Sequence, residues 1–200
     1  MNLELLALVI AVYVGGLLLL RQRRHSLFGY AWSAFGFAVV LILMGQAGGW
    51  HESLGNLQAN ILKAAAGRIA FDLDLLGRSN LIVPDPTGWS VLSIGIECST
   101  LIEASVFTGI MLFYPRFPLQ ERITRTAIGV VATFMINLVR LAVIVGMIAW
   151  LGKPAVPWAH ALVGRLVFFL GIIGVYWYML TMPTLRMVKR DLEVSGRAVL

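Results

Sequence analysis

Residues 127–150 read AIGVVATFMINLVRLAVIVGMIAW, an apolar run whose polar residues are Thr133, Asn137 and Arg140. About 20 such residues are enough for a helix to cross the hydrocarbon core of a bilayer. An arginine inside a membrane helix is costly unless it faces a partner or water. The stretch therefore predicts a transmembrane helix, and Arg140 needs an explanation.

The composition of the whole chain agrees with this prediction. Of the 200 residues, 59% are hydrophobic and 13% are charged, and the mean hydropathy is +0.85. Soluble globular domains contain about 25% charged residues. After several membrane spans, little of the chain is left for a soluble domain. We expect one integral membrane domain over residues 1–200, with an all-α, polytopic membrane helix bundle as its fold.

Apolar stretches predict about five transmembrane helices, at roughly 3–20, 27–44, 96–114, 127–150 and 159–182. The first run precedes its charges instead of following them, so we expect a retained span and not a cleaved signal peptide. The sequence has no internal repeat of the kind found in many secondary transporters.

The basic residues predict the orientation of these spans. Arg21-Gln22-Arg23-Arg24-His25 follows the first span, and more basic residues follow the third and fifth spans. These are Arg116, Arg122, Arg125, Arg186, Lys189, Arg190 and Arg197. Cytoplasmic loops carry an excess of Lys and Arg. We therefore expect a multi-pass cell-membrane protein with its amino terminus outside and its carboxyl terminus in the cytoplasm.

The segment 46–95 lies on the outer side in this topology. Its first half is expected to form an amphipathic helix at the membrane surface. The apolar stripe of that helix is Leu57, Ile61, Leu62, Ala65, Ile69 and Ala70. The cluster Pro84-Asp85-Pro86-Thr87-Gly88 predicts a turn, and Trp50 and Trp89 suit anchoring at the lipid interface. Membrane lipid is therefore an expected partner.

The charge and the cysteine count exclude other classes of function. The net charge is +6 and the pI is near 10.0, but the basic residues form short clusters beside apolar runs. This pattern does not indicate a nucleic-acid partner. One cysteine cannot form an intramolecular disulfide, and no Cys and His grouping has zinc-site spacing. We predict no nucleic acid, no metal and no cofactor.

The only cysteine lies in Glu97-Cys98-Ser99-Thr100, near the outer end of the third span. Arg140 lies about ten residues from the outer end of its helix, or roughly 15 Å. Asn137 is three residues earlier and so on the same face. His160 opens the fifth span from the same side. Cys98, Arg140 and His160 are therefore expected together in the outer half of the bundle.

These three side chains would support acyl transfer. A thiolate is the attacking species, and a nearby imidazolium and guanidinium would both lower the thiol pKa. His160 would protonate the leaving amine, while Arg140 would hold the developing oxyanion or the substrate carbonyl. The site predicted in this way attacks a peptide bond at the outer membrane face.

Structural interpretations of the same residues stay open at this point. A buried cysteine is usually a small hydrophobe, and an interfacial histidine is often a snorkelling or capping group. Arg165 lies five residues after His160 and points about 140° away on a regular helix, toward the same cavity or another partner. Glu97 and Glu103 are possible counter-ions of the two arginines, and Glu97 is otherwise a helix-start charge.

Three motifs resemble the exosortase/archaeosortase family in order and in side of the membrane. They are ECST at residues 97–100, NLVR at residues 137–140 and WAHALVG at residues 158–164. The resemblance covers roughly residues 88–176. It implies a catalytic half at about 88–182, with Cys98 as nucleophile, Arg140 as the arginine of the family and His160 as the third member. Some members use an arginine as the third catalytic residue, so the resemblance also makes Arg165 a candidate for this role.

The resemblance implies a membrane-embedded cysteine protease or transpeptidase of the cell envelope. Its expected partner is the C-terminal sorting signal of exported proteins, made of a short motif, a transmembrane helix and a basic tail. The chain departs from the family in having about five spans where many relatives have more. It also carries Ser99-Thr100 where relatives often place a small residue and glycine.

A different class of function competes with this one. In a small-solute transporter or an envelope assembly subunit, Arg140 and Glu103 would form an intramembrane ion pair. The sequence does not decide whether the enzyme hydrolyses its substrate or transfers it to an amine. It also does not decide whether His160 or Arg165 is the third member of the site.

Overall fold

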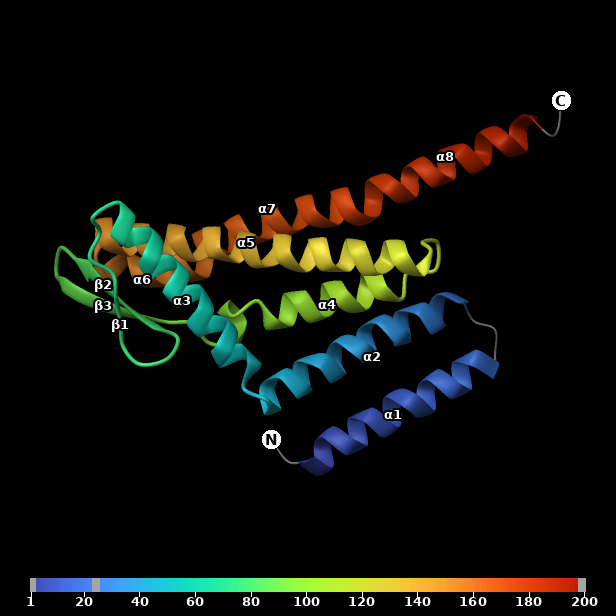
Figure 1. Cartoon of the computed structure of the whole chain (residues 1–200), viewed down its shortest axis with the longest axis horizontal. Helices are drawn as coiled ribbons and strands as arrows, with labels where there is room; N and C mark the ends of the chain where they lie inside the picture. Colours follow the sequence, from blue (N-terminus) through green and yellow to red (C-terminus); the bar gives the residue numbers. More distant parts are fainter. Residues whose placement is uncertain (1–2, 23–25, 198–200) are drawn as a thin grey trace.

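The structure, a computed structural model, describes residues 3–22 and 26–197. It consists of a row of helices, called the bundle here, with a smaller cap at one end (Figure 1). The bundle contains α1 (Leu3–Gln22), α2 (Ser26–Ala47), α4 (Leu101–Leu112), α5 (Leu119–Leu151), α6 (Val156–Trp158), α7 (Gly164–Tyr176) and α8 (Met182–Arg197). The cap contains α3 (Trp50–Arg68), β1 (Asp74–Leu75), β2 (Asn80–Asp85), β3 (Gly88–Ser93) and the 3-10 turn η1 (Ile96–Cys98).

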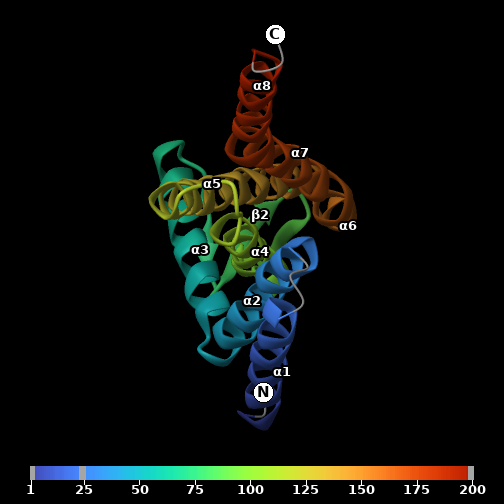
Figure 2. The ribbon, with the colours of Figure 1, turned by 90° about the vertical axis from the view of Figure 1, so that its right-hand side faces the viewer.

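The helices of the bundle are stacked one on the next in the order α1, α2, α4, α5 and α7. Figure 2 looks along the bundle and shows this row, with α3 on one side of α5 and α6 on the other. Both α4 and α7 pack against α5. Residues of η1, α5 and the start of α7 can therefore meet at the cap end of the bundle.

Among the described residues, three helical segments are long and apolar enough to cross a membrane: Leu27–Ala47, Leu119–Leu151 and Lys153–Glu193. Leu6–Leu20 and Leu101–Leu112 are shorter apolar helices. Each of the five predicted spans overlaps one of these five segments. Three of the segments have the length and the composition of a helix that crosses a membrane. The third span begins later than predicted, because residues 96–100 form a turn and α4 starts only at Leu101.

Small residues let the helices approach closely at several points. A side chain at Gly36 would collide with Tyr13 of α1, and one at Gly45 would come within 2.8 Å of Leu101. A side chain at Gly109 would meet the backbone carbonyl of Ala34, so α2 and α4 are in backbone contact there. Such contacts are typical of packed membrane helices.

The cap contains a three-stranded antiparallel sheet in the order β1-β2-β3, so the predicted all-α fold is wrong in this respect. Leu81 faces Leu92 across β2 and β3, and Val83 faces Ser90. These four residues are buried, while their neighbours along the strands point away from the core. The predicted turn at 84–88 connects the two strands. The carboxylate of Asp85 accepts hydrogen bonds from the Thr87 amide and the Ser90 hydroxyl, which lower its pKa.

Helix α3 occupies the place of the predicted amphipathic helix, but it buries a different face. The buried residues are Gly55, Gln58, Ala59, Leu62 and Ala66. Of the predicted apolar stripe only Leu62 is buried, whereas Leu57, Ile61, Ala65, Ile69 and Ala70 are exposed. The helix packs against the sheet and α5 through small residues, and an ion pair of 2.6 Å joins Lys63 to Asp74 of β1.

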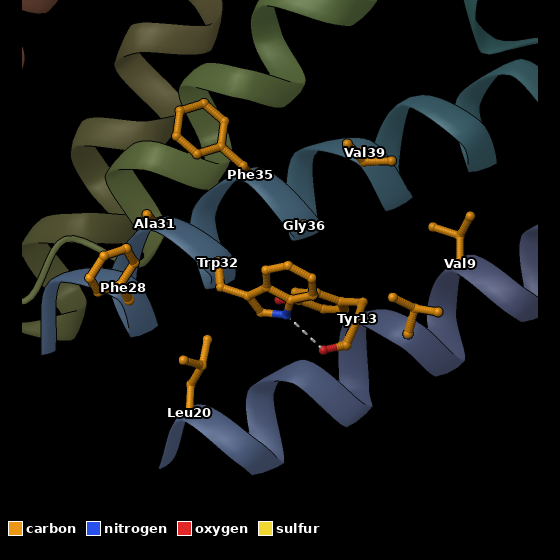
Figure 3. A pocket seen from close by; sticks show the side chains of 10 residues that line it. Val9, Tyr13, Leu20, Phe28, Ala31, Trp32, Phe35, Gly36 and Val39 are labelled. Carbon is orange, nitrogen blue, oxygen red and sulfur yellow. Dashed lines mark hydrogen bonds between the residues drawn. The ribbon is translucent and has the colours of Figure 1, made fainter. Parts of the chain in front are cut away.

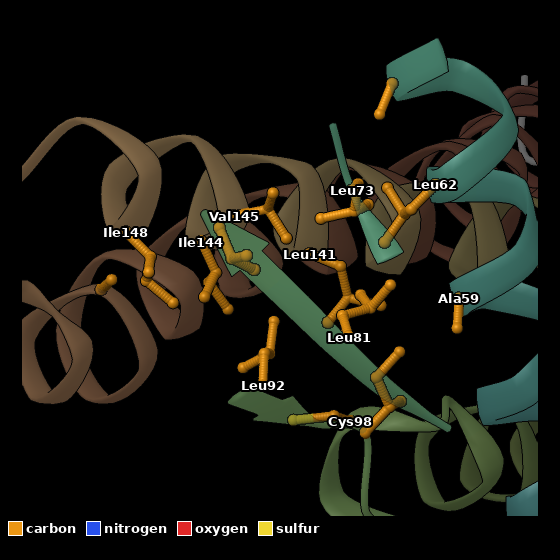
Figure 4. Packing of buried hydrophobic residues seen from close by; sticks show 14 residues of the cluster. Ala59, Leu62, Leu73, Leu81, Leu92, Cys98, Leu141, Ile144, Val145 and Ile148 are labelled. Carbon is orange, nitrogen blue, oxygen red and sulfur yellow. The ribbon is translucent and has the colours of Figure 1, made fainter. Parts of the chain in front are cut away.

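Helix α5 connects the bundle to the cap. Its 33 residues span about 50 Å, which exceeds the roughly 30 Å hydrocarbon core of a bilayer. The last turns pack on the sheet and α3, as Figure 4 shows for Leu141, Ile144 and Val145. Cys98 belongs to the same buried cluster. Arg140 therefore lies where the bundle meets the cap.

The last helical stretch contains two π-helical turns, η3 (Ala159–Val163) and η4 (Trp177–Thr181). A short 3-10 turn, η2 (Lys153–Ala155), joins it to α5. π-Turns are rare and often occur at functional sites. His160 lies in η3, so the expected regular helix between His160 and Arg165 is interrupted.

The predicted basic loops lie at the end of the bundle opposite the cap. The facing ends of α1 and α2 and the connection from α4 to α5 are at this end (Figure 1). Arg116 in that connection contacts Asp191 of α8 at 3.4 Å. Arg23, Arg24 and His25 of the first predicted loop are outside the described residues.

An apolar cavity of about 550 Å³ lies between α1 and α2. Figure 3 shows its lining, in which the Trp32 indole donates a hydrogen bond of 3.1 Å to the Tyr13 carbonyl. Its lining contains no Asp, Glu, Lys, Arg, His or Cys. It shares no lining residue with the cavity beside Arg140 that is described below.

Candidate active site

The turn that carries Cys98 has an unusual backbone. Cys98 closes η1, and Thr100 has a φ of 72° immediately before α4. A β-branched residue in the left-handed region is strained, at a cost of about 1–3 kcal/mol. Glycine adopts this conformation freely. Thr100 therefore needs a partner that keeps it in this conformation.

Arg140 reaches this turn from α5. Its Nη2 is 3.6 Å from the Cys98 Sγ, and its Nη1 donates a hydrogen bond of 3.4 Å to the Glu97 backbone carbonyl. The guanidinium also lies over the ring of Phe168, 5.5 Å from its centroid. Arg140 is only 5% exposed, and its Nε has no hydrogen-bond partner in the described structure. A buried cation is therefore held directly against the thiol.

His160 reaches the same sulfur from η3. Its Nε2 is 3.9 Å from the Cys98 Sγ, a contact in which either tautomer is possible. This distance is at the long end of a sulfur hydrogen bond, and catalytic contacts are often loose before substrate binds. Cys98, Arg140 and His160 thus come together from three separate elements at one point.

Asn137 fixes the backbone of the turn. Its side-chain amide donates a hydrogen bond of 2.5 Å to the Cys98 carbonyl, and the side chain is buried. Asn137 and Arg140 are three residues apart on α5, so one helix face contacts both the backbone and the sulfur of Cys98. Asn137 therefore holds the backbone that carries the thiol in place and makes no contact that would favour the thiolate.

A cavity of about 710 Å³ adjoins Arg140 between α4 and α7. Arg165, Glu97 and Glu103 line it together with Arg140, so Arg165 faces the same cavity. Its remaining lining is apolar and includes Leu162, Leu166, Phe169 and Ile172 of η3 and α7. The cavity thus has a charged part, which includes the Arg140 side chain that contacts the thiol, and an apolar part along α7.

The predicted counter-ions do not form direct ion pairs. Within the described part of the chain, no carboxylate oxygen of Glu97 or Glu103 lies within 4.0 Å of a side-chain nitrogen of Arg140 or Arg165. The Oε2 atom of Glu103 is buried without a hydrogen-bond partner. The direct Arg140–Glu103 pair expected for a transporter is therefore absent from these contacts.

Cys98 lies in the turn before α4, outside the helices that could cross a membrane. Burial raises the pKa of its thiol, and Glu103 and Glu97 act in the same direction. Arg140 lowers the pKa, but its effect is smaller than that of burial. The predicted lowering by the guanidinium is therefore confirmed for Arg140, but burial outweighs it and the net shift of the thiol pKa is upward. A raised pKa favours the neutral thiol, so a base has to remove its proton before the sulfur attacks.

The pH dependence of thiol alkylation tests this electrostatic arrangement. Because Cys98 is the only cysteine, iodoacetamide reports on it alone. We expect the rate to rise with pH, with a midpoint above that of an unperturbed thiol. Arg140→Gln should move the midpoint further upward, since the cation that favours the thiolate is lost. Arg116→Gln at the opposite end should leave it unchanged. A lower midpoint in Arg140→Gln would contradict this assignment.

One contact to the turn escaped the sequence analysis. The amide of Gln58, on α3, donates a hydrogen bond of 2.7 Å to the hydroxyl of Thr100. Both residues are buried. A glutamine within the predicted amphipathic helix was the only available signal, and nothing near it in the sequence indicates that its partner is Thr100.

Comparisons with protein-family models, curated proteins and solved structures found no match to this chain. The chemistry proposed for the site therefore rests on its geometry and on the three sequence motifs.

Proposed function

We propose that this protein is a membrane-embedded cysteine peptidase or transpeptidase, with Cys98, Arg140 and His160 as its catalytic residues. The observation that carries the proposal is one buried thiol 3.6 Å from Arg140 Nη2 and 3.9 Å from His160 Nε2. A cysteine that only fills space needs neither neighbour. Burying a guanidinium against it is costly, which favours a chemical reason for the contact.

The reaction begins when Nε2 of neutral His160 accepts the thiol proton. The sulfur attacks the carbonyl carbon of the substrate, and Arg140 stabilises the negative charge that develops on the carbonyl oxygen. Collapse of this intermediate breaks the carbon–nitrogen bond, and His160 returns its proton to the leaving amine. A thioester on Cys98 remains. Water or an amine then attacks the thioester, giving hydrolysis or transfer.

The cavity beside Arg140 suits a peptide that is polar at one end and apolar at the other. Its charged part includes Arg140, whose Nη2 is 3.6 Å from the Cys98 sulfur, and the peptide bond has to lie between this cavity and the sulfur. Its apolar part continues along α7 past Leu166 and Phe169, both of which are exposed. This arrangement supports a C-terminal sorting signal as the substrate, with the motif at Cys98 and the transmembrane helix beside α7.

The topology and the family belong to the same proposal. The cap lies on the outer side of the cell membrane, and the basic end of the bundle lies in the cytoplasm, where Lys and Arg are enriched. All five apolar segments cross the membrane. The chain is then an exosortase or archaeosortase relative that acts on exported proteins, as its three ordered motifs suggest.

Trapping of the thioester tests this function. The full chain in lipid nanodiscs is incubated with reporters that end in a short motif, an apolar helix and a basic tail, taken from co-expressed proteins. We expect a covalent adduct between enzyme and reporter that neutral hydroxylamine cleaves, because hydroxylamine attacks thioesters. A reporter without the motif is the control. Processing without an adduct on Cys98, or an adduct that resists hydroxylamine, would contradict the mechanism.

A further inference from the structure

The hydrogen bond between Gln58 and Thr100 connects the cap to the turn that carries the thiol. Gln58 is fully buried on α3, and its Nε2 donates to the Thr100 Oγ1 at 2.7 Å. Its Oε1 is buried without a hydrogen-bond partner among the described residues. A buried amide that is only partly satisfied is unfavourable for folding. Gln58 is therefore a poor choice for packing alone.

Thr100 uses its side chain in an unusual way. It is the N-cap residue of α4, yet its hydroxyl makes no capping hydrogen bond to the helix. Instead the hydroxyl is held by Gln58, while φ is 72°. Threonine avoids this backbone conformation because of its branched side chain. Among the described residues, the hydrogen bond to Gln58 is the one that the Thr100 side chain makes, and it holds the strained conformation in place.

The turn is held from both sides. Asn137 of α5 donates to the Cys98 carbonyl, and Gln58 of α3 binds the hydroxyl two residues later. If Thr100 relaxed to a negative φ, the chain direction between Cys98 and α4 would change. The sulfur would then leave its place between Arg140 and His160. Shifts of about 1 Å in a reacting group can cost about a hundredfold in rate.

We propose that Gln58 is a positioning residue that keeps Thr100 in the left-handed conformation and so fixes Cys98 between Arg140 and His160. The role of the thiol rests on the proposed function, whereas the effect of Gln58 on the turn does not. Among the described residues, the side-chain hydrogen bond of Gln58 goes to Thr100 and not to Cys98, and Gln58 does not line the cavity beside Arg140. It acts only through Thr100.

Two substitutions at Thr100 separate strain from the loss of a hydrogen bond. Thr100→Ala and Thr100→Gly both remove the hydroxyl, but only glycine adopts a positive φ without strain. We expect Thr100→Ala to loosen the turn and Thr100→Gly to keep it. In the same way, Gln58→Ala should loosen the turn, and the double variant Gln58→Ala with Thr100→Gly should restore it.

Iodoacetamide alkylation of Cys98 in the full chain measures the state of the turn without any substrate. Cys98 is 3% exposed, so loosening should raise the limiting rate at high pH by about tenfold. We expect this rise in Gln58→Ala and Thr100→Ala and wild-type rates in Thr100→Gly and in the double variant. Asn60→Ala, on the exposed face of α3, is the control that should change nothing.

The processing reaction supplies the second measurement. Gln58→Ala and Thr100→Ala should lose about tenfold in kcat with little change in KM. Thr100→Gly, alone or combined with Gln58→Ala, should keep the kcat of the wild type. Equal alkylation rates in Thr100→Gly and Thr100→Ala, or an unchanged rate in Gln58→Ala, would overturn the proposal. If the alkylation pattern holds but the wild type processes no reporter, Gln58 still positions the turn and the proposed function fails.

Discussion

Replacing Cys98 with serine should reduce processing of a sorting-signal reporter by about a thousandfold or more. A serine hydroxyl ionises far less readily than a thiol, and His160 alone is a weak base for it. The backbone of the turn should not change, because Asn137 binds the carbonyl of residue 98 and not its sulfur. The measurement is the fraction of reporter cleaved in a single turnover.

Ser99→Ala is the matched control for this variant. Ser99 is adjacent and buried, and its hydroxyl donates only to the Ile96 carbonyl within the same turn. Its loss should leave processing within a few-fold of the wild type. A protein whose activity survives Cys98→Ser is not a cysteine peptidase. That outcome would favour the transporter or assembly interpretation, in which the thiol has no chemical role.

The sequence predicts the helices of this protein well because membrane helices have strong, local signals. Runs such as 127–150 need no partner to be recognised, since length and hydropathy decide them. Strands β2 and β3 were missed because they are only six residues each and lie in a polar segment. The alternation of exposed and buried residues in 88–94 and the turn at 84–88 together are the sequence pattern of a β-hairpin.

Some residues of the candidate site could be predicted from the sequence, and others could not. Cys98, Arg140 and His160 were named because each is a rare residue at the end or middle of an apolar run. Gln58 could not be predicted, because its importance depends on the φ of a residue far along the chain. The net direction of the thiol pKa could not be predicted either, since burial outweighs the charge of Arg140 and only a fold reveals burial.

His160→Gln should lower kcat by about a hundredfold to ten-thousandfold, because the group that moves the proton is lost. Arg165→Gln should instead act mainly on KM. The reason is geometric: His160 Nε2 is 3.9 Å from the sulfur, whereas Arg165 lines the neighbouring cavity. Both variants are measured with one reporter under single-turnover conditions, so proton transfer and binding are separated.

This pair of variants decides which residue is the third member of the site. Arg165 is exposed and forms no ion pair among the described residues, so its charge is available to a substrate in the cavity. Arg165→Lys should then recover much of the binding, since it retains the charge. A larger loss of kcat in Arg165→Gln than in His160→Gln would transfer the third role to Arg165. His160 would then be left as a neighbour that only covers the thiol.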